Sequence, residues 1–387
     1  MLPLYLDYAA TTPVDRRVMT AMYACLGFEG AFGNPASPHD YGQQAAQKVE
    51  HARAQVAALI GAEPREILWT SGATEANNLA LQGVAYFYKN RGQHIITVKT
   101  EHKAVLDVCA FLKKQGFEIT YLFPGSDGIL DPQQLTQALR PDTLLVSIMQ
   151  VNNETGVIQP LEEIAPLVKA NHSFLHVDAA QSLGKLPIDL RQLPVDLMSF
   201  SAHKIYGPKG AGALYVRHRP VVRLQPLFYG GGQEQGRRSG TLATHQIVGM
   251  GEACAILQNE MPAEVVRIQA LKQRFLDGLW QHPTLKTTLG IHGNYQRSSC
   301  HIVNLFFPGI DSDVLMQALP QLALSSGSAC TALELQPSHV LQAMGVPDAV
   351  AHRSLRFSFG RMTTNADVDH ALQLITQCVD SIQSFPR

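Results

Sequence analysis

Residues 174–204 read FLHVDAAQSLGKLPIDLRQLPVDLMSFSAHK, and this stretch decides the fold class. Its two apolar runs, FLHV and DLMSF, are typical of short buried strands. The first run is followed by Asp178, and the second by Ser201, His203 and Lys204. Open α/β sheets form their ligand crevice at the carboxyl ends of their strands. The stretch therefore predicts an α/β fold with a ligand site at these strand ends.

The same alternation of strand-like and helical patterns continues on both sides of this stretch. Apolar residues repeat with the helical period at 49–60 and again at 76–87, between strand-like runs. This alternation predicts a large, mainly parallel sheet of seven strands covered by helices. The other five strand candidates are EILW at 66–69, HIITV at 94–98, EITYLF at 118–123, TLLVSIM at 143–149 and ALYV at 213–216.

The pattern changes after about residue 245. A long helical stretch follows, which Pro262 is expected to kink or divide. Two further strands, IVNLFF and SLRFSF, precede a final helix whose start at Thr364, with Asp367 three residues on, has the spacing of a capping box. We expect an N-terminal arm at 1–15, a large domain at 16–258 and a small domain at 259–387.

Composition excludes several functional classes. The 387 residues include 31 basic and 32 acidic side chains, a net charge of −1, which supplies no basic field for nucleic acid or a membrane surface. No long apolar run or secretory signal is visible, so a cytoplasmic protein is expected. The six cysteines lie far apart with no C-x-x-C pair, which argues against zinc sites and disulfides.

Three features at strand ends together indicate a cofactor. The turn in ILWTSGATEANNLAL leads into a helix whose N-terminus suits a phosphate, although Thr74 as a plain helix cap is the alternative. The carboxylate of Asp178, at the end of a buried strand, needs a cationic partner, and a protonated ring nitrogen of a cofactor would satisfy it; capping a helix is the alternative. The poorly solvated amine of Lys204 suits Schiff-base chemistry, whereas a solvated surface lysine is the alternative. Pyridoxal 5'-phosphate has the matching phosphate, ring nitrogen and aldehyde.

Three more polar residues at strand ends would complete such a site. His102, after HIITVKTE, is a candidate to stack on the cofactor ring, or else a histidine that caps a loop. Asn153 and Gln181 are candidates to hydrogen-bond the phenolic oxygen of the ring, or else simply terminate their strands.

Ten short motifs occur in the same order and with the same spacing as in a known protein family. The sequence closely resembles cysteine desulfurases of the NifS and IscS type, which are fold-type I pyridoxal phosphate enzymes. The resemblance runs from Tyr5 to about Arg361 and implies a large domain with a seven-stranded sheet and a smaller α+β C-terminal domain. The strings are LDYAATTP, FGNPAS, TSGATEANN, TEHKAVLD, VNNETG, HVDAAQS, SFSAHKIYGPKG, RRSGTL, SSGSACT and RFSFGR.

The resemblance also implies a role for each matching residue. Lys204 would be the Schiff-base lysine, Asp178 the partner of the pyridine nitrogen, and His102 the stacking and proton-transfer residue. Thr241 would reach the phosphate from the other subunit of a homodimer. The remaining implied contacts are Ala73, Thr74, Ser201 and His203 to the phosphate, Asn153 and Gln181 to the ring oxygens, and Arg356, Asn34 and Asn153 to the substrate.

Cys330 is the cysteine expected to act. It lies in LSSGSACTAL, a small-residue stretch without helical or strand period, where a thiol that ionises is a competent sulfur acceptor. The resemblance implies that L-cysteine becomes L-alanine and leaves a persulfide on Cys330, for iron-sulfur cluster assembly or tRNA thiolation. No permanent metal site is expected; at most Cys330 ligates an iron-sulfur cluster transiently. A selenocysteine lyase, an aminotransferase and a sulfur-relay subunit are the alternatives.

The sequence departs from the family pattern at two places. SAHK replaces the usual SGHK, so Ala202 is expected to add a methyl group beside the phosphate site. The chain ends at Arg387, about one helix before the end of IscS-like members, whose tail helps to dock the iron-sulfur scaffold protein. Whether a scaffold or another acceptor takes the sulfur is therefore left open.

Overall fold

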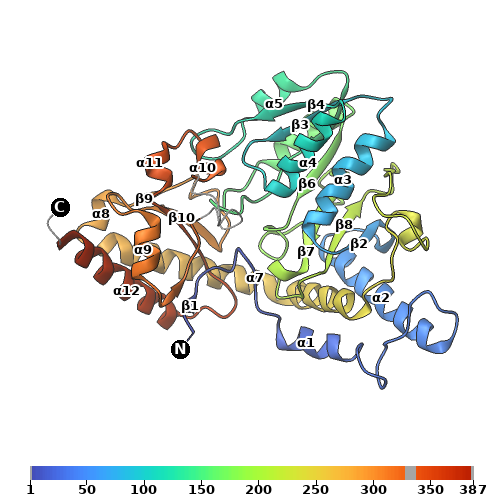
Figure 1. Cartoon of the computed structure of the whole chain (residues 1–387), viewed down its shortest axis with the longest axis horizontal. Helices are drawn as coiled ribbons and strands as arrows, with labels where there is room; N and C mark the ends of the chain where they lie inside the picture. The colour runs from blue at the N-terminus through green and yellow to red at the C-terminus, as the bar shows by residue number, and fades with distance from the viewer. Residues whose placement is uncertain (1, 327–336, 385–387) are drawn as a thin grey trace.

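A computed structural model describes residues 2–326 and 337–384 and shows a seven-stranded sheet at the centre of the larger part of the chain (Figure 1). The four pairings from β4 through β3, β5 and β6 to β7 are parallel, whereas β8 pairs antiparallel with both β7 and β2. All seven predicted strands are confirmed. In sheet order they are β2 (Ile67–Thr70), β8 (Gly212–Val216), β7 (Leu197–Ser201), β6 (Phe174–Asp178), β5 (Thr143–Ser147), β3 (His94–Val98) and β4 (Glu118–Leu122).

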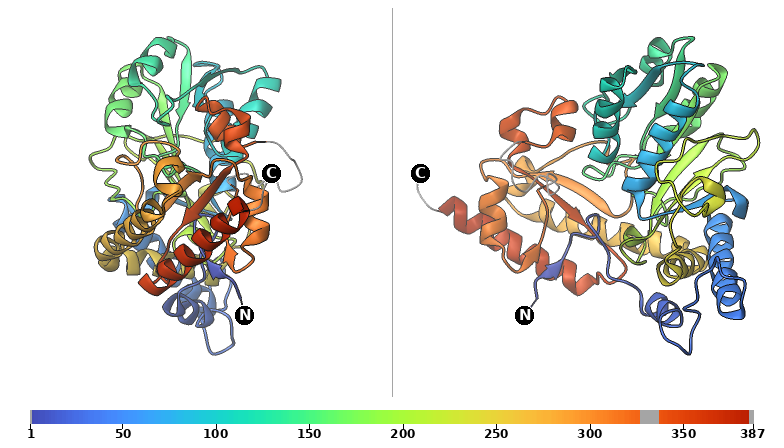
Figure 2. Two further views of the ribbon diagram at one scale, coloured as in Figure 1. Left: turned by 90° about the vertical axis from the view of Figure 1, so that its left-hand side faces the viewer. Right: turned by 45° about the vertical axis from the view of Figure 1, so that its right-hand side comes forward.

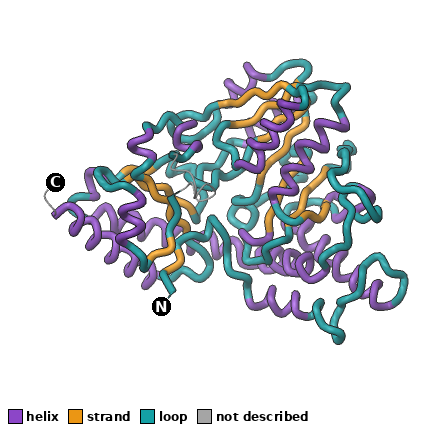
Figure 3. Tube along the Cα trace, viewed as in Figure 1, coloured by secondary structure: helices purple, strands orange, loops and turns teal. Residues whose placement is uncertain are grey.

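Helices cover both faces of this sheet (Figures 2 and 3). One face packs on α3 (Ala73–Phe87) and α4 (Lys103–Lys114), whose apolar residues form one core with the strands. The other face packs on α2, α5, α6 and the first half of α7. Burial on both faces explains why the strands read as continuous apolar runs. The bounds of the second set are α2 (Asp40–Leu59), α5 (Pro132–Ala138), α6 (Leu161–Ala170) and α7 (Thr244–Gln281).

The 38-residue helix α7 joins two hydrophobic cores. Its residues from Ile247 to Leu257 pack under the large sheet, whereas those from Ile268 to Leu279 pack under a second, three-stranded sheet of order β12-β10-β9. Pro262 lies between the two sets but does not divide the helix. The strands of the second sheet are β9 (Gly290–Ile291), β10 (Ile302–Phe306) and β12 (Ser354–Ser358).

The predicted capping box of the last helix is confirmed. α12 (Asn365–Ser384) begins directly after Thr364, whose backbone N–H donates to Asp367 Oδ2 at 2.8 Å, while Asp367 N–H donates to Thr364 Oγ1 at 3.2 Å. The remaining elements are β1 (Leu4–Tyr5), α1 (Arg16–Tyr23), η1 (Pro64–Glu66), η2 (Ala202–Lys204), η3 (Glu234–Gly236), α8 (Leu285–Thr288), α9 (Ser312–Ala318), β11 (Leu322–Ala323), α10 (His339–Ala343) and α11 (Asp348–Ala351). Within the described ranges, no helix combines the length and apolarity needed to cross a membrane.

Candidate active site

A cavity of about 550 Å³ lies at the carboxyl ends of the parallel strands. Parallel pairing of β6 with β7 sets Asp178 opposite Ser199, which brings the polar residues after both strands to one edge. Most of the residues predicted from the sequence therefore converge here. Those that line the cavity are Ala73, Thr74, His102, Asn153, Asp178, Gln181, Ser201, His203, Lys204 and Arg356.

One end of the cavity is the N-terminus of α3. The helix is preceded by Gly72, which has no side chain to cap it, so the first backbone N–H groups of α3 are open to a ligand. Thr74 lies inside the first turn, so its alternative role as the helix cap is wrong. A β-carbon built at Gly72 would meet no atom within 4 Å, which leaves room for a ligand beside the turn.

Asp178 is a buried carboxylate that is held from two sides. Asn77 Nδ2, on α3, donates to its Oδ2 at 2.6 Å, and Ala180 N–H donates to its Oδ1 at 2.9 Å. The side chain is only 5 % exposed. Sequence reasoning missed Asn77; the available signal was a polar residue one turn after Ala73, at the start of a helix that packs on the sheet.

His102 is the N-cap of α4. Its Nδ1 accepts a hydrogen bond from Ala104 N–H at 3.1 Å, and its ring also lines the cavity. The preceding residue, Glu101, is fully buried and accepts from Met149 N–H at 2.7 Å. Burial, with a smaller effect of the Asp178 charge, raises the pKa of Glu101 well above its usual value. Glu101 thus holds the backbone of Met149, a residue that lines the cavity.

Lys204 ends the short helix η2 and points its amine at the N-terminal segment. Its Nζ donates to the carbonyl oxygens of Ala9 at 2.5 Å and Ala10 at 2.7 Å. His203 Nδ1 lies 3.1 Å from Thr11 Oγ1 of the same segment. Burial, followed by the charges of Lys204 and Lys209, lowers the pKa of His203 to about 4. The His203 ring is therefore neutral at pH 7.

The two amides at the strand ends have different surroundings. Asn153 Oδ1 is buried and has no hydrogen-bond partner among the described residues, so it is available to a ligand. Gln181 donates from Nε2 to Ala9 O at 2.8 Å, and its Oε1 lies 3.3 Å from His301 Nε2. Burial lowers the pKa of His301 well below its usual value, so a neutral imidazole orients Gln181.

Arg356 enters the cavity from β12, in the second core. Its Nη1 donates to Asn153 O at 2.8 Å, and its Nη2 forms an ion pair with Asp7 Oδ1 at 2.7 Å. Nε is buried without a partner among the described residues. A guanidinium fixed in this way, with a donor left over, is suited to bind a carboxylate. Asp7 had no assigned role in the sequence, because the chain separates it from Arg356 by 349 positions.

Glu154 is a second buried carboxyl group that sequence reasoning missed. It accepts a hydrogen bond from Ser338 Oγ, and its electrostatic neighbours include Arg356 and His102. Burial raises the pKa of Glu154 to about 7, although Ser338 and Arg356 act in the opposite direction. A carboxyl group that titrates near neutral pH therefore lies next to Asn153, which lines the cavity.

Two predicted site residues, Asn34 and Thr241, do not line the cavity of this chain. Cys330 lies outside the described residues. Asn34 and Thr241 are both exposed in loops, and Asn34 Oδ1 accepts from Ala36 N–H at 3.0 Å. Ala202 does not add a methyl group beside the phosphate site. Its side chain is buried in the core, where its β-carbon would lie 3.0 Å from one built at Gly207, so this expectation was wrong.

The donor set fits pyridoxal 5'-phosphate. The open helix N-terminus with Ser201 and His203 suits the phosphate, and the buried Asp178 carboxylate suits a protonated ring nitrogen. Asn153 Oδ1 is a buried acceptor in need of a donor, and the Lys204 amine shares the cavity. The cavity thus offers a match for each polar group of the cofactor.

Comparisons with known proteins agree with the fold and the cavity. The aminotransferase class-V family matches residues 4–371, and the chain belongs to this family, whose members use pyridoxal phosphate.

Full-length relatives narrow the assignment. The chain is 55% identical over 385 residues to cysteine desulfurase IscS of Shewanella loihica, which covers 99% of this chain and 94% of that protein. A solved NifS-like protein is 36% identical with a TM-score of 0.90, covering 98% of this chain and 100% of that one. The structure of SspA in complex with cysteine is 37% identical with a TM-score of 0.81, covering 93% and 99%. Within the class-V family, the chain belongs with the IscS-type cysteine desulfurases.

Proposed function

We propose that this protein is a cysteine desulfurase that converts L-cysteine to L-alanine and collects the sulfur as a persulfide on Cys330. The observation that carries the proposal is the convergence of Lys204, Asp178 and Arg356 in one cavity. Pyridoxal phosphate, when bound, supplies an aldehyde for the substrate amine and a ring that accepts electrons. The atoms balance, because L-cysteine and the Cys330 thiol together yield L-alanine and the Cys330 persulfide.

The protein's own side chains bind the substrate and transfer its protons. Arg356 binds the substrate carboxylate and fixes its orientation, with Asp7 and the Asn153 carbonyl holding the guanidinium. The Lys204 amine takes the proton from the α-carbon, and His102 assists the proton transfers. Asp178, held by Asn77, would pair with the ring nitrogen of the cofactor.

The surroundings of the other five cysteines support the assignment of Cys330. None of them lines the cavity, and burial raises the pKa of every one of these thiols, for Cys109 and Cys254 to about 12. A thiolate is needed to attack sulfur, so they are poor acceptors. Ser325 pairs with Arg356, which lines the cavity, and the Ser325 carbonyl accepts from Arg356 N–H at 2.8 Å. Cys330 follows Ser325 shortly afterwards in the chain, so we assign its thiol to this cavity.

The proposal includes a homodimer in which Thr241 reaches the phosphate site of the partner subunit. An exposed aromatic cluster supports it: Phe28 stacks on Phe32 with ring centroids 5.6 Å apart, and Tyr41 lies 5.3 Å from Phe32. Exposed aromatic patches of this kind mark interfaces. Asn34 lies within this cluster along the chain, which would also explain why it is remote from the cavity of its own subunit.

The physiological setting is part of the same proposal. An iron-sulfur scaffold or a tRNA-thiolation factor would accept the sulfur, and the protein would act in the cytoplasm, where its five described cysteines, all free, remain reduced. We divide the chain into an arm at 1–15, a large cofactor-binding domain at 16–258 and a small domain at 259–387 that carries the cysteine.

The decisive experiment follows L-alanine and sulfide from L-cysteine in wild type and Cys330→Ser, with an added dithiol that reduces the persulfide to free sulfide and with cofactor absorbance recorded throughout. Wild type should form both products, whereas Cys330→Ser should retain the absorbance and release no sulfide. Cys378→Ser, which changes a partly buried cysteine outside the cavity, is the matched control and should behave as wild type. Undiminished sulfide release by Cys330→Ser would refute the assignment, and amino transfer to a keto acid instead of desulfuration would favour an aminotransferase.

A further inference from the structure

A tyrosine with a strained backbone lies two residues after Lys204. Tyr206 has a φ of 65°, in the left-handed region that residues with a β-carbon rarely occupy. Such conformations persist where the surroundings fix them, and they concentrate at functional sites. Tyr206 is also 1 % exposed, so its surroundings are entirely protein. The contacts that hold this conformation are therefore of interest for the neighbouring Lys204.

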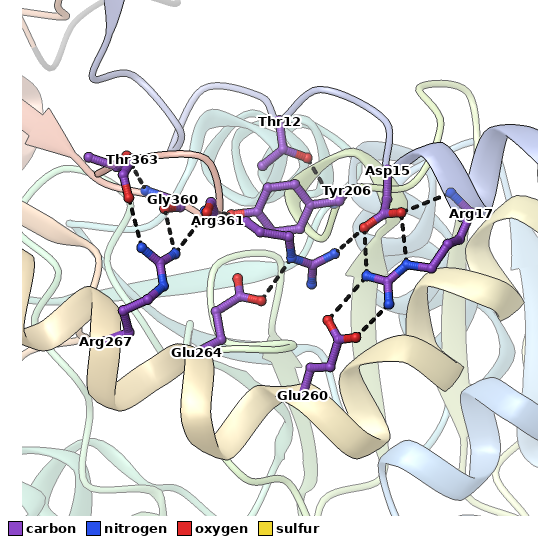
Figure 4. Close-up of polar contacts among 10 residues, drawn as sticks. All are labelled: Thr12, Asp15, Arg17, Tyr206, Glu260, Glu264, Arg267, Gly360, Arg361 and Thr363. Atoms are coloured by element: carbon purple, nitrogen blue, oxygen red, sulfur yellow. Dashed lines mark hydrogen bonds and ion pairs between the residues drawn. The ribbon is translucent and has the colours of Figure 1, made fainter. Parts of the chain in front are cut away.

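Every polar atom of Tyr206 is held by a residue from a distant part of the chain (Figure 4). Its N–H donates to Thr12 Oγ1 at 2.8 Å, and its carbonyl accepts from Asp15 N–H at 2.9 Å. Its hydroxyl oxygen accepts from Arg361 N–H at 2.5 Å. Tyr206 is therefore clamped between the N-terminal segment and the connection from β12 to α12.

The side chain of Arg361 reinforces this clamp. Its guanidinium lies 4.2 Å from the centre of the Tyr206 ring. Nη1 pairs with Asp15 Oδ2 at 2.6 Å, and Nε pairs with Glu264 Oε2, on α7, at 2.9 Å. The arginine is thus balanced by two largely buried carboxylates and packs on an aromatic face, an arrangement that fixes its position.

Both ends of the clamp connect to the candidate active site. Between Lys204 and Tyr206 the chain makes a tight turn, in which the Ala202 carbonyl accepts from the N–H groups of Ile205 and Gly207, each at 3.0 Å. Arg361 follows β12, the strand that carries Arg356. A shift of Tyr206 would therefore move the Lys204 amine relative to the Arg356 guanidinium.

We propose that Tyr206 and Arg361 are positioning residues that set the location of the Lys204 amine relative to the Arg356 guanidinium. The inference rests on the proposed function, in which Arg356 binds the substrate carboxylate and Lys204 takes the α-proton. These two groups act on adjacent atoms of one small substrate, and displacement by about 1 Å can cost a hundredfold in rate. Neither residue lines the cavity; each acts through its neighbours in the chain.

The test uses Tyr206→Phe in the full-length holoenzyme. This variant keeps the ring but removes the acceptor for Arg361 N–H. We expect kcat for L-alanine formation per bound cofactor to fall about tenfold, with KM for L-cysteine within about twofold of wild type, because Arg356 itself is unchanged. In the cofactor-free protein, amide hydrogen exchange at 202–207 should accelerate. Tyr215→Phe, at a buried tyrosine on β8 outside this cluster, is the control and should change none of the three quantities.

Arg361 supplies the second arm of the test. Arg361→Met should lower kcat and raise KM, and Arg361→Lys, which retains the charge, should recover part of both. If Arg361→Met is insoluble, Tyr206→Phe and Arg361→Lys decide. Wild-type kcat, KM and exchange in Tyr206→Phe, even with a lowered melting temperature, would overturn the inference and leave a purely structural role. A wild-type protein that forms no alanine would instead contradict the proposed function, whatever the exchange result.

Discussion

Replacing Glu154 by Gln should remove a pH-dependent loss of stability. Glu154 is only 2 % exposed, and burial raises the pKa of its carboxyl group to about 7 from the ordinary 4.5. The folded protein therefore holds this proton more tightly than the unfolded chain. The contribution to stability is complete below pH 4.5 and is lost as the pH rises to 7. A shift of about 2.5 pKa units corresponds to about 3 kcal/mol.

The assay is chemical denaturation of cofactor-free wild type and Glu154→Gln at several pH values from 5 to 8. The difference between the two free energies of unfolding cancels the histidines that titrate in both proteins. It should move in favour of the variant by about 2.5 kcal/mol across this range. Burial raises the pKa of Glu75, but hydrogen bonds from Arg238 and Ser71 outweigh it and hold that pKa below its usual value. Glu75→Gln should therefore show a pH-independent difference over this range. A flat difference for Glu154→Gln as well would refute the reasoning.

Three further outcomes are expected. Lys204→Ala should lose the absorbance band of the tethered cofactor, and its persistence would point to another lysine. Arg356→Lys should raise KM for L-cysteine about tenfold or more while kcat changes less. A lysine ammonium cannot pair with Asp7, donate to the Asn153 carbonyl and bind the substrate carboxylate at the same time. An unchanged KM would contradict the contact assigned to Arg356. Gly207→Ala would place a β-carbon 2.9 Å from the Ala202 carbonyl oxygen, so it should destabilise the protein by about 1–3 kcal/mol in thermal or chemical unfolding; wild-type stability would show that the turn relaxes freely.

The sequence was sufficient for the large sheet and for the residues at its strand ends. HIITV became β3 with the predicted bounds, and FLHV became β6 with Asp178 as its last residue. These predictions succeeded because apolar runs covered on both faces specify strands locally, and because parallel pairing brings the carboxyl ends to one edge. The capping box at Thr364 was also readable, since its two partners are three residues apart.

Only the tertiary structure revealed the groups that hold the site together. Asp7 reaches Arg356 across 349 positions, and Arg361 reaches Tyr206 across 155. Pairs so distant leave no periodic signal in one sequence, because they form only when the two cores and the N-terminal segment pack together. The surroundings of Ala202 were also wrongly predicted, because its side chain packs in the large core, which the sequence alone did not show. Local pattern thus decided which residues carry chemistry, and packing between remote segments decided how firmly each is held.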